Sequence, residues 1–253
     1  MESCAINPKP LSLVVVGAGP TGVELCGDLC DLIEENLRYR YPELKGLKHE
    51  VFLIQGGGEI LPMLHEKARK IAHHILEKSG IKILLDSRVT KVGKDYVMVE
   101  DKKINADIII WSGGIKPPKL NISPDIQDEK GYIPVDEDMR VKGHDDIYAL
   151  GDITGTPQLA QAAIEQAKTA AKNIIGKKKS FRFHNKGLIV SLGHKKAVGE
   201  VYLFGKTIVV KGKMAWYMKR MIYLMNLIGL KNKVQVGIEW AFNLIFGRDI
   251  SEI

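Results

Sequence analysis

A glycine-rich turn between an apolar run and an amphipathic helix pattern constrains the fold of this chain more than any other feature. Residues 11–16 (Leu-Ser-Leu-Val-Val-Val) are almost continuously apolar, which is typical of a strand buried on both faces of a parallel sheet. Gly-Ala-Gly-Pro-Thr-Gly follows at 17–22, and apolar residues then recur at helical spacing up to residue 39. The sequence therefore predicts an α/β fold built on a parallel sheet.

The turn has the form G-x-G-x-x-G in the strand-turn-helix context that this motif requires. Gly17 permits the tight turn, Gly19 lets a pyrophosphate approach the backbone, and Gly22 lets the helix pack on the strand. The helix N-terminus favours the phosphate charge. We predict a dinucleotide site that also includes Pro20 and Thr21; the alternative is a glycine turn that binds nothing.

The residue that follows the second expected strand is unusual, and this position helps to distinguish NADH from NADPH. A carboxylate there normally meets the adenosine ribose hydroxyls, whereas this chain has Gln55 followed by three glycines. A neutral amide can bond a ribose without repelling a 2'-phosphate. We predict weakened discrimination between NADH and NADPH, with a surface glutamine indifferent to cofactor as the alternative.

The length of 253 residues, with 45% hydrophobic and 26% charged residues, fits one large or two modest folded domains. A glycine and proline series at 113–118 is a plausible domain boundary. The further elements expected are strands at 50–54, 81–85, 96–100, 106–111 and 147–150, helices at 65–78 and 159–175, and short strands with turns at 187–211.

Charge and cysteine usage exclude several function classes. The net charge of +7 and the pI near 9.1 suit an anionic partner, but no nucleic-acid-binding module is visible. No metal site is expected, because His73 and His74 are adjacent and face different ways on a helix. The three cysteines, at 4, 26 and 30, form no disulfide framework; we interpret Cys26 and Cys30 as core thiols rather than redox groups.

Five segments together resemble the type II (non-proton-pumping) NADH dehydrogenases, which are NAD(P)H:quinone oxidoreductases. They are Val-Val-Val-Gly-Ala-Gly-Pro-Thr-Gly-Val-Glu-Leu at 14–25, Glu-Ile-Leu-Pro at 59–62, Trp-Ser-Gly-Gly-Ile-Lys-Pro at 111–117, Tyr-Ala-Leu-Gly-Asp at 148–152 and Ala-Gln-Ala-Ala-Ile-Glu-Gln-Ala at 160–167. The resemblance covers nearly the whole chain.

The resemblance implies a Rossmann-like NAD(P)H domain at 10–113, the C-terminal part of an FAD domain at 114–210 and a C-terminal amphipathic helical pair at 211–253. It implies FAD and NADH or NADPH as cofactors and a quinone as the electron acceptor. In the family the NADH domain is inserted between two halves of the FAD domain. This sequence begins sixteen residues before its nucleotide motif, so we expect a truncated form, one member of a split pair or a fragment that lacks the first FAD half. A separate chain carrying that half, or a second copy of this chain, is then an expected partner.

The resemblance also assigns residues. Gly151 and Asp152 would bond the flavin's ribitol or pyrophosphate region, and Ala160 and Gln161 would lie against the isoalloxazine. Three residues match the family helix between flavin and quinone, Gln161, Glu165 and Gln166, although the family commonly has glutamine where Glu165 stands. Glu24 matches a family glutamate near the nicotinamide; the alternative is a first-turn carboxylate that favours the helix dipole. Gly113 completes the expected cofactor residues.

The C-terminal 43 residues are apolar, aromatic and basic, with a local charge of +4 (seven Lys and Arg against three Asp and Glu). Their uncharged stretches are too short to span a bilayer. We predict two helices lying in one leaflet, with Trp216, Tyr217, Tyr223 and Trp240 at the headgroups, on the cytoplasmic face of the cell membrane. A hairpin that packs on the chain's own core or dimerises is the alternative.

Two other functions stay open at this stage. The first is a non-catalytic, nucleotide-binding and membrane-attached remnant or subunit. The second is a disulfide reductase of the same superfamily, although its C-terminus would be a soluble dimerisation domain rather than an apolar and basic helical pair.

Overall fold

The computed structural model describes residues 9–246 except 40, 42, 43, 45, 156 and 204. The chain forms two compact units, one of residues 1–113 with 186–253 and the other of residues 114–185. The expected boundary after residue 113 is thus also a boundary between compact units. The functional assignment of the three predicted segments stays a prediction.

The first unit is built on a four-stranded parallel sheet in the order β3-β2-β1-β7. The strands are β1 (Ser12–Val16), β2 (Glu50–Ile54), β3 (Ile81–Leu84) and β7 (Ile108–Trp111). Side chains alternate across β1: Leu13 and Val15 belong to one buried cluster, and Val14 and Val16 belong to another. Both faces of β1 are covered, which explains why its sequence shows no polar alternation.

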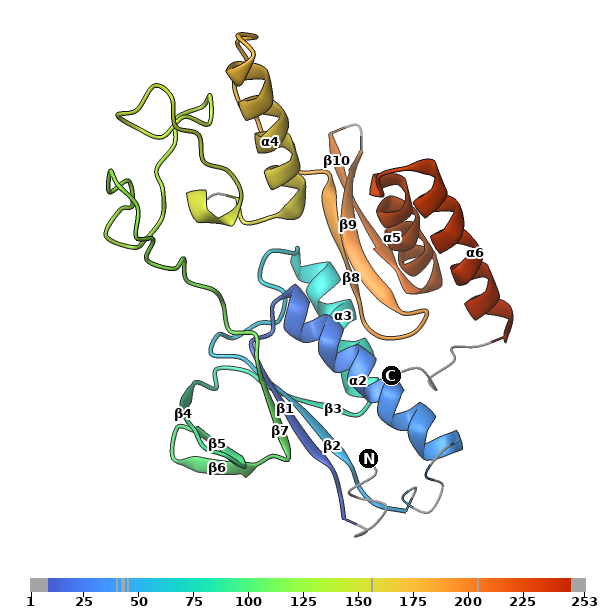
Figure 1. Ribbon diagram of the computed structural model, residues 1–253. Coiled ribbons are helices and arrows are strands. Elements are labelled where there is room, and N and C mark those ends of the chain that lie inside the picture. The colour runs from blue at the N-terminus through green and yellow to red at the C-terminus, as the bar shows by residue number, and fades with distance from the viewer. Residues whose placement is uncertain are drawn as a thin grey trace. The chain divides into compact units, whose positions relative to one another are not determined.

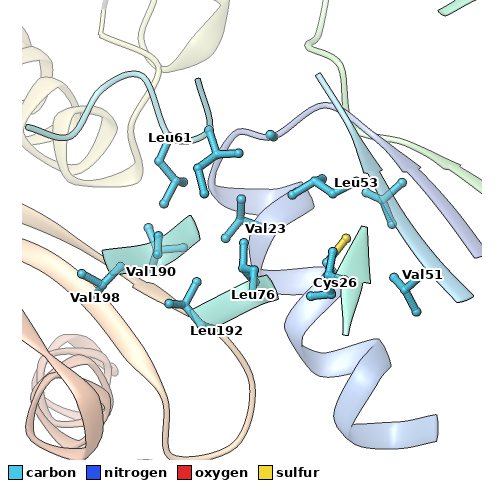
Figure 2. Packing of buried hydrophobic residues seen from close by; sticks show 14 of the residues in the cluster. Val23, Cys26, Val51, Leu53, Leu61, Leu76, Val190, Leu192 and Val198 are labelled. Carbon is cyan, nitrogen blue, oxygen red and sulfur yellow. The ribbon is translucent and has the colours of Figure 1, made fainter. Parts of the chain in front are cut away.

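Two helices cover one face of this sheet, α2 (Pro20–Tyr39) and α3 (Glu66–Lys78), as Figure 1 shows. Both were predicted from their apolar spacing. Val23 and Cys26 of α2 and Leu76 of α3 are fully buried beside Leu53 of β2 (Figure 2). The predicted interpretation of Cys26 as a core thiol agrees with this position.

A three-stranded antiparallel meander covers the other face of the sheet: β4 (Val89–Val92), β5 (Tyr96–Val99) and β6 (Lys102–Asn105). Only β5 was predicted. It buries Val97 and Val99, whereas three of the four residues of β4 and of β6 are exposed. The outer strands form by pairing with β5, so their own sequences carry almost no apolar signal.

A second antiparallel sheet, in the order β10-β9-β8, lies on the far side of α2 and α3 (Figure 1). Its strands are β8 (Gly187–Ser191), β9 (Ala197–Leu203) and β10 (Lys206–Lys211). Val190, Leu192 and Val198 extend the core of the first sheet and its helices (Figure 2). A Cβ on Gly27 of α2 would lie 2.5 Å from the Gly193 nitrogen, so the helix backbone touches the turn after β8.

The predicted C-terminal pair consists of α5 (Gly212–Asn226) and α6 (Leu230–Phe246). Helix α5 packs against the second sheet through Ala215 and Trp216. Trp216 is only 7% exposed, so the prediction that it lies among lipid headgroups is wrong for this residue. Its ring packs edge-on against His194 and Tyr217 instead.

The second unit contains a short 3₁₀ turn, η2 (Asp152–Thr154), and helix α4 (Ala160–Ile174). The helix agrees with prediction, but the strand expected at 147–150 is wrong. That segment makes only an isolated bridge, Arg140 to Tyr148, and buries Ala149 in a small cluster with Ile133 and Val141. The apolar run reflects this small core, since no neighbouring strand is present among the described residues of the unit.

Candidate functional site

Three hydrogen bonds hold the glycine turn after β1 at the carboxyl edge of the parallel sheet. Gly17 N donates to Ile54 O at 2.8 Å, and Leu61 N donates to Ala18 O at 2.8 Å. Ala18 N donates to the side-chain Oε1 of Gln55 at 3.0 Å. The loop is therefore fixed by the ends of β1 and β2 and by the segment that leads to α3.

The three motif glycines differ in what a side chain would meet. A Cβ on Gly17, which has a φ of +104°, would lie 2.6 Å from Ser112 O, and one on Gly22 would lie 1.9 Å from Gly17 O. A Cβ on Gly19 would meet nothing within 4 Å. Gly17 and Gly22 are thus required by the packing of the chain itself, whereas Gly19 leaves an open space beside the backbone.

The open space lies at the start of α2. Pro20 is the first helical residue, a position that suits its fixed φ and its missing N–H, and Thr21 beside it is exposed. The first-turn amides of a helix have no partner within the helix and carry the positive end of its dipole. Together these features form a cradle that fits the pyrophosphate of a dinucleotide.

Ser112 is a residue of this site that the sequence analysis missed. It follows β7 and sits under the turn: its Oγ lies 2.9 Å from Val16 O and 3.0 Å from Gly17 O, and its N donates to Val16 O at 2.7 Å. A Cβ on Gly22 would lie 2.6 Å from this Oγ. No sequence motif marks this role, because it depends on the pairing of β7 with β1. The predicted cofactor residue Gly113 comes next and is exposed beside the Trp111 ring.

Glu24 forms an ion pair that neither interpretation of it anticipated. Its Oε1 lies 2.5 Å from Lys219 Nζ of α5 and accepts a hydrogen bond from Ser191 N at 3.3 Å. Lys219 Nζ also donates to Ser191 Oγ at 3.0 Å. The first turn of α2 contains no acidic residue, so the alternative of a first-turn carboxylate is wrong. Glu24 thus connects α2 to α5 of the C-terminal helix pair.

A second polar contact ties α3 to the C-terminal sheet. The carboxylate of Glu200, in β9, is 1% exposed and accepts from His65 N at 2.6 Å, and its other oxygen lies 2.7 Å from His65 Nδ1. His65 precedes α3 directly and has no capping hydrogen bond from its own side chain. The buried carboxylate is thus placed at the positive end of the helix dipole.

In the second unit, the residues expected at the flavin are organised by Gln166. This side chain is 1% exposed, and its Oε1 accepts a hydrogen bond from Gly151 N at 2.7 Å. Gly151 has a φ of +81°, a conformation that favours glycine, and Asp152 beside it is exposed. Gln166 therefore positions the Gly-Asp turn rather than facing solvent.

The start of α4 presents accessible groups. Ala160 and Gln161 are exposed, and the preceding Leu159 makes no side-chain capping bond. Gln161 and Glu165 share a helix face, and Glu165 pairs with Lys168 at 2.8 Å. The small Ala160 and the uncapped first-turn amides fit an electron-rich group such as a flavin ring, and the exposed Asp152 carboxylate fits a hydroxyl donor.

Among the residues that the structure describes, no group of three or more His, Cys, Asp or Glu could hold a metal ion. The two thiols of α2 are unreactive by environment. Burial, with a smaller contribution from Cys30, raises the pKa of Cys26 to about 12, and burial together with the Asp31 charge raises that of Cys30 to about 12.

Comparison with known families identifies the fold. The profile described as "Pyridine nucleotide-disulphide oxidoreductase" matches residues 2–167, and that of the "NDH2 C-terminal domain" matches residues 185–249. The chain belongs to the pyridine nucleotide-disulphide oxidoreductase family. The C-terminal match begins where the second compact unit ends, at residue 185, and includes both α5 and α6.

Several relatives of this chain are named as NADH or NAD(P)H:quinone oxidoreductases, the family that the sequence resembles. An internal alternative NAD(P)H-ubiquinone oxidoreductase A1, mitochondrial, of Solanum tuberosum is 33% identical over 96% of this chain and 54% of its own length. A probable NADH-ubiquinone oxidoreductase, mitochondrial, of Schizosaccharomyces pombe is 30% identical over 95% of this chain and 53% of its own length. A type II NADH:quinone oxidoreductase of Mycobacterium tuberculosis is 28% identical over 95% and 56%. The chain spans about half the length of these relatives, and the resemblance to type II NADH dehydrogenases is confirmed.

A solved structure of NDH2 from Plasmodium falciparum in complex with NADH matches with a TM-score of 0.85. It is 18% identical and covers 98% of this chain and 70% of its own. At that identity the match confirms the predicted α/β, Rossmann-like fold of this pyridine nucleotide-disulphide oxidoreductase.

Proposed function

We propose that the chain acts in a type II NAD(P)H:quinone oxidoreductase. The observation that carries the proposal is the fixed turn at 17–22, in which Gly19 alone is not required by the packing. The C-terminal match to the NDH2 domain supports the quinone rather than the disulfide substrate, since the resemblance implies a soluble dimerisation domain at this place in a disulfide reductase.

The residues of the first unit would bind and orient NADH or NADPH. The amides at the start of α2 and the open backbone at Gly19 would receive the pyrophosphate, and Gln55, directly after β2, would face the adenosine ribose. Ser112 stabilises the conformation of the turn through its hydrogen bonds to Val16 O and Gly17 O. Glu24, paired with Lys219, would stand on the nicotinamide side of the loop.

The residues of the second unit would hold FAD. Asp152 would accept from a ribitol hydroxyl, Gln166 would keep Gly151 in place, and the uncapped start of α4 at Ala160 and Gln161 would favour the electron-rich reduced ring. FAD, when bound, supplies the group that takes a hydride and passes electrons onward. Gln161 and Glu165 share the α4 face that we assign to the quinone.

The C-terminal helices support attachment to one leaflet of a membrane. Among the described helices, none is both long and apolar enough to cross a bilayer. Large apolar side chains are nevertheless exposed on both: Met214, Tyr217, Met221, Ile222, Tyr223, Met225, Leu230, Val234, Ile238 and Phe242, together with Leu227 and Ile228 between the helices. Lys213 and Lys231 are exposed beside them and suit anionic lipid.

Two cations of α5 have partners within the chain. Lys219 pairs with Glu24, and the Arg220 guanidinium lies 4.0 Å from the Trp216 ring and 4.8 Å from the Trp240 ring. Arg220 thus joins α5 to α6 by cation–π contacts and gives the exposed apolar face a fixed shape. We propose that this face lies on the cytoplasmic side of the membrane, where a quinone enters from lipid.

The test is the visible spectrum of the purified full chain after incubation with FAD and desalting. Retained absorbance at about 450 nm that bleaches on anaerobic addition of NADH supports a working flavin reductase. Quinone must then restore the colour. A colourless chain that binds NADH contradicts independent activity and favours the non-catalytic subunit, and a chain that binds neither cofactor contradicts both.

A further inference from the structure

The carboxyl ends of β2 and β3 are tied together beside the nucleotide turn. Asp86 N, just after β3, donates to Gly57 O at 3.0 Å, and Ser87 N donates to Gln55 O at 2.9 Å. Because β1, β2 and β3 are parallel, these ends lie at the same sheet edge as the turn at 17–22. In open α/β sheets ligands bind outside this edge.

The carboxylate of Asp86 lies against the glycine run that follows β2. A Cβ built on Gly58 would stand 3.3 Å from Asp86 Oδ1 and 3.4 Å from Oδ2. A Cβ on Gly56 would meet nothing within 4 Å, and one on Gly57 would meet only Gln55 Nε2 at 3.6 Å. A ligand can thus approach the backbone of this run.

Asp86 is exposed and has a φ of +49°. Within the described part of the chain the Asp86 carboxylate makes no hydrogen bond, ion pair or ring contact. An ionised carboxylate is an acceptor only, so its natural partners are hydroxyl or amine donors, and it repels a phosphate.

Gln55 presents the opposite chemistry. Its Oε1 already accepts from Ala18 N, which leaves one neutral acceptor site on that oxygen, and its Nε2 only donates. The charged acceptor for the adenosine ribose hydroxyls, which dinucleotide folds place at the end of β2, is therefore missing from residue 55. Asp86 offers one from the neighbouring strand.

We propose that Asp86 accepts hydrogen bonds from the adenosine ribose hydroxyls of NADH and disfavours the 2'-phosphate of NADPH. This inference rests on the proposed function, because it assumes that the turn at 17–22 binds the dinucleotide. Gln55 alone predicts weak discrimination between the two cofactors. Asp86 adds a preference for NADH that comes from a residue outside the motif.

The experiment titrates the full chain with NADH and, separately, with NADPH, and follows nicotinamide fluorescence. It compares the wild type with Asp86→Asn and with Asp95→Asn, which removes the same charge from an exposed turn between β4 and β5. Circular dichroism checks that each variant is folded. Gln55→Glu, placed in the Asp86→Asn background, returns a carboxylate to the end of β2.

The wild type is expected to bind NADH more tightly than NADPH. Asp86→Asn should raise the dissociation constant for NADH about tenfold, as expected for a lost hydrogen bond to a charged group, without weakening NADPH. Asp95→Asn should change neither constant, and adding Gln55→Glu should restore the preference for NADH.

Three results would overturn the inference, and they separate it from the proposed function. An unchanged ratio of the two dissociation constants in Asp86→Asn removes the role of Asp86 and leaves nucleotide binding intact. If Asp86→Asn raises the dissociation constants for both cofactors equally, Asp86 only maintains the conformation of the loop. A folded wild type that binds neither nucleotide contradicts the proposed function itself, and the inference with it.

Discussion

The glycine turn at 17–22 and the C-terminal helix pair at 212–246 lie in the same compact unit but are determined in different ways. In the turn, a Cβ on Gly17 or on Gly22 would stand less than 3 Å from a backbone atom of the chain. In the helix pair, Ile228 and Leu230 are 89% and 78% exposed. Packing within the chain therefore determines which residues the turn can hold. The exposed apolar side chains of the helix pair instead suit a partner outside the chain.

The largest expected effect is that of Gly22→Ala. The added methyl would stand 1.9 Å from Gly17 O, a backbone atom that cannot move without breaking the pairing of β1 with β2. We expect a loss of several kcal/mol, on the order of an overpacked core, and in practice an unfolded or insoluble chain. Thermal unfolding followed by circular dichroism measures it.

Gly237→Ala is the matched control in the tail. A Cβ there meets nothing within 4 Å, and Gly237 lies inside α6. Alanine favours a helix over glycine by about 1 kcal/mol, so this variant should be equally or more stable than the wild type. If both glycine variants have the same melting temperature, the two regions do not differ as described.

The reactivity of the two thiols of α2 measures how well the packing around this helix excludes solvent and reagents. With the pKa of Cys26 raised from 9.0 to about 12, the thiolate fraction near neutral pH is roughly a thousandfold lower than in a free cysteine. Alkylation by iodoacetamide, followed residue by residue with mass spectrometry, should be slower by a similar factor and should recover in denaturant. Alkylation of the folded chain at the rate of a free thiol would contradict the packing.

The same thiols predict a pH dependence of stability. The folded state holds these protons more tightly than the unfolded state, so the thiols leave stability constant below pH 9 and lower it between pH 9 and about 12. Urea midpoints measured for the wild type and for Cys26→Ala across this range should converge as the pH rises.

The tail is expected to bind lipid through its exposed face. Leu230→Asp with Val234→Asp places charges on the apolar face of α6, where both side chains are exposed, so folding should be preserved. Each apolar side chain withdrawn from the bilayer should cost about 1.5–3 kcal/mol, or roughly tenfold or more in partitioning. Flotation with vesicles of mixed neutral and anionic lipid measures it.

Val92→Asp supplies the matched control, because Val92 is 48% exposed on β4 and lies outside the tail. It should float as the wild type does. Equal flotation of the tail variant and the wild type would favour the alternative that the helix pair packs against a second copy of this chain.

The smallest expected effect is that of Ser112→Ala. Losing the hydroxyl that contacts Val16 O and Gly17 O should cost about 1 kcal/mol of stability and raise the dissociation constant for NADH a few-fold. Urea unfolding and fluorescence titration measure the two effects. A variant identical to the wild type in both would remove Ser112 from the support of the turn.

The sequence predicted β1, the turn and α2 because three local signals agree there: a doubly buried strand, a required glycine pattern and an amphipathic helix. It failed where structure depends on distant partners. β4 and β6 exist through pairing with β5, and the apolar run at 147–150 packs in a small core without a strand partner.

The candidate site shows the same difference between residues that local sequence reveals and residues that act through distant partners. The motif glycines could be named from the sequence, whereas Ser112, Lys219 and Glu200 act through contacts with residues 95, 195 and 135 positions away. The buried position of Gln166 follows from α4 packing and gives it a partner, Gly151 N, that the resemblance did not indicate.

The most direct test of the central claim compares NADH binding by the wild type and by Gly19→Ala. Gly19 has open space around it, so the variant should keep the melting temperature of the wild type. Its methyl group would occupy the space assigned to the pyrophosphate, and we expect affinity for NADH to fall at least about tenfold. A folded Gly19→Ala variant that binds NADH as tightly as the wild type would contradict the assignment of this turn as the dinucleotide site.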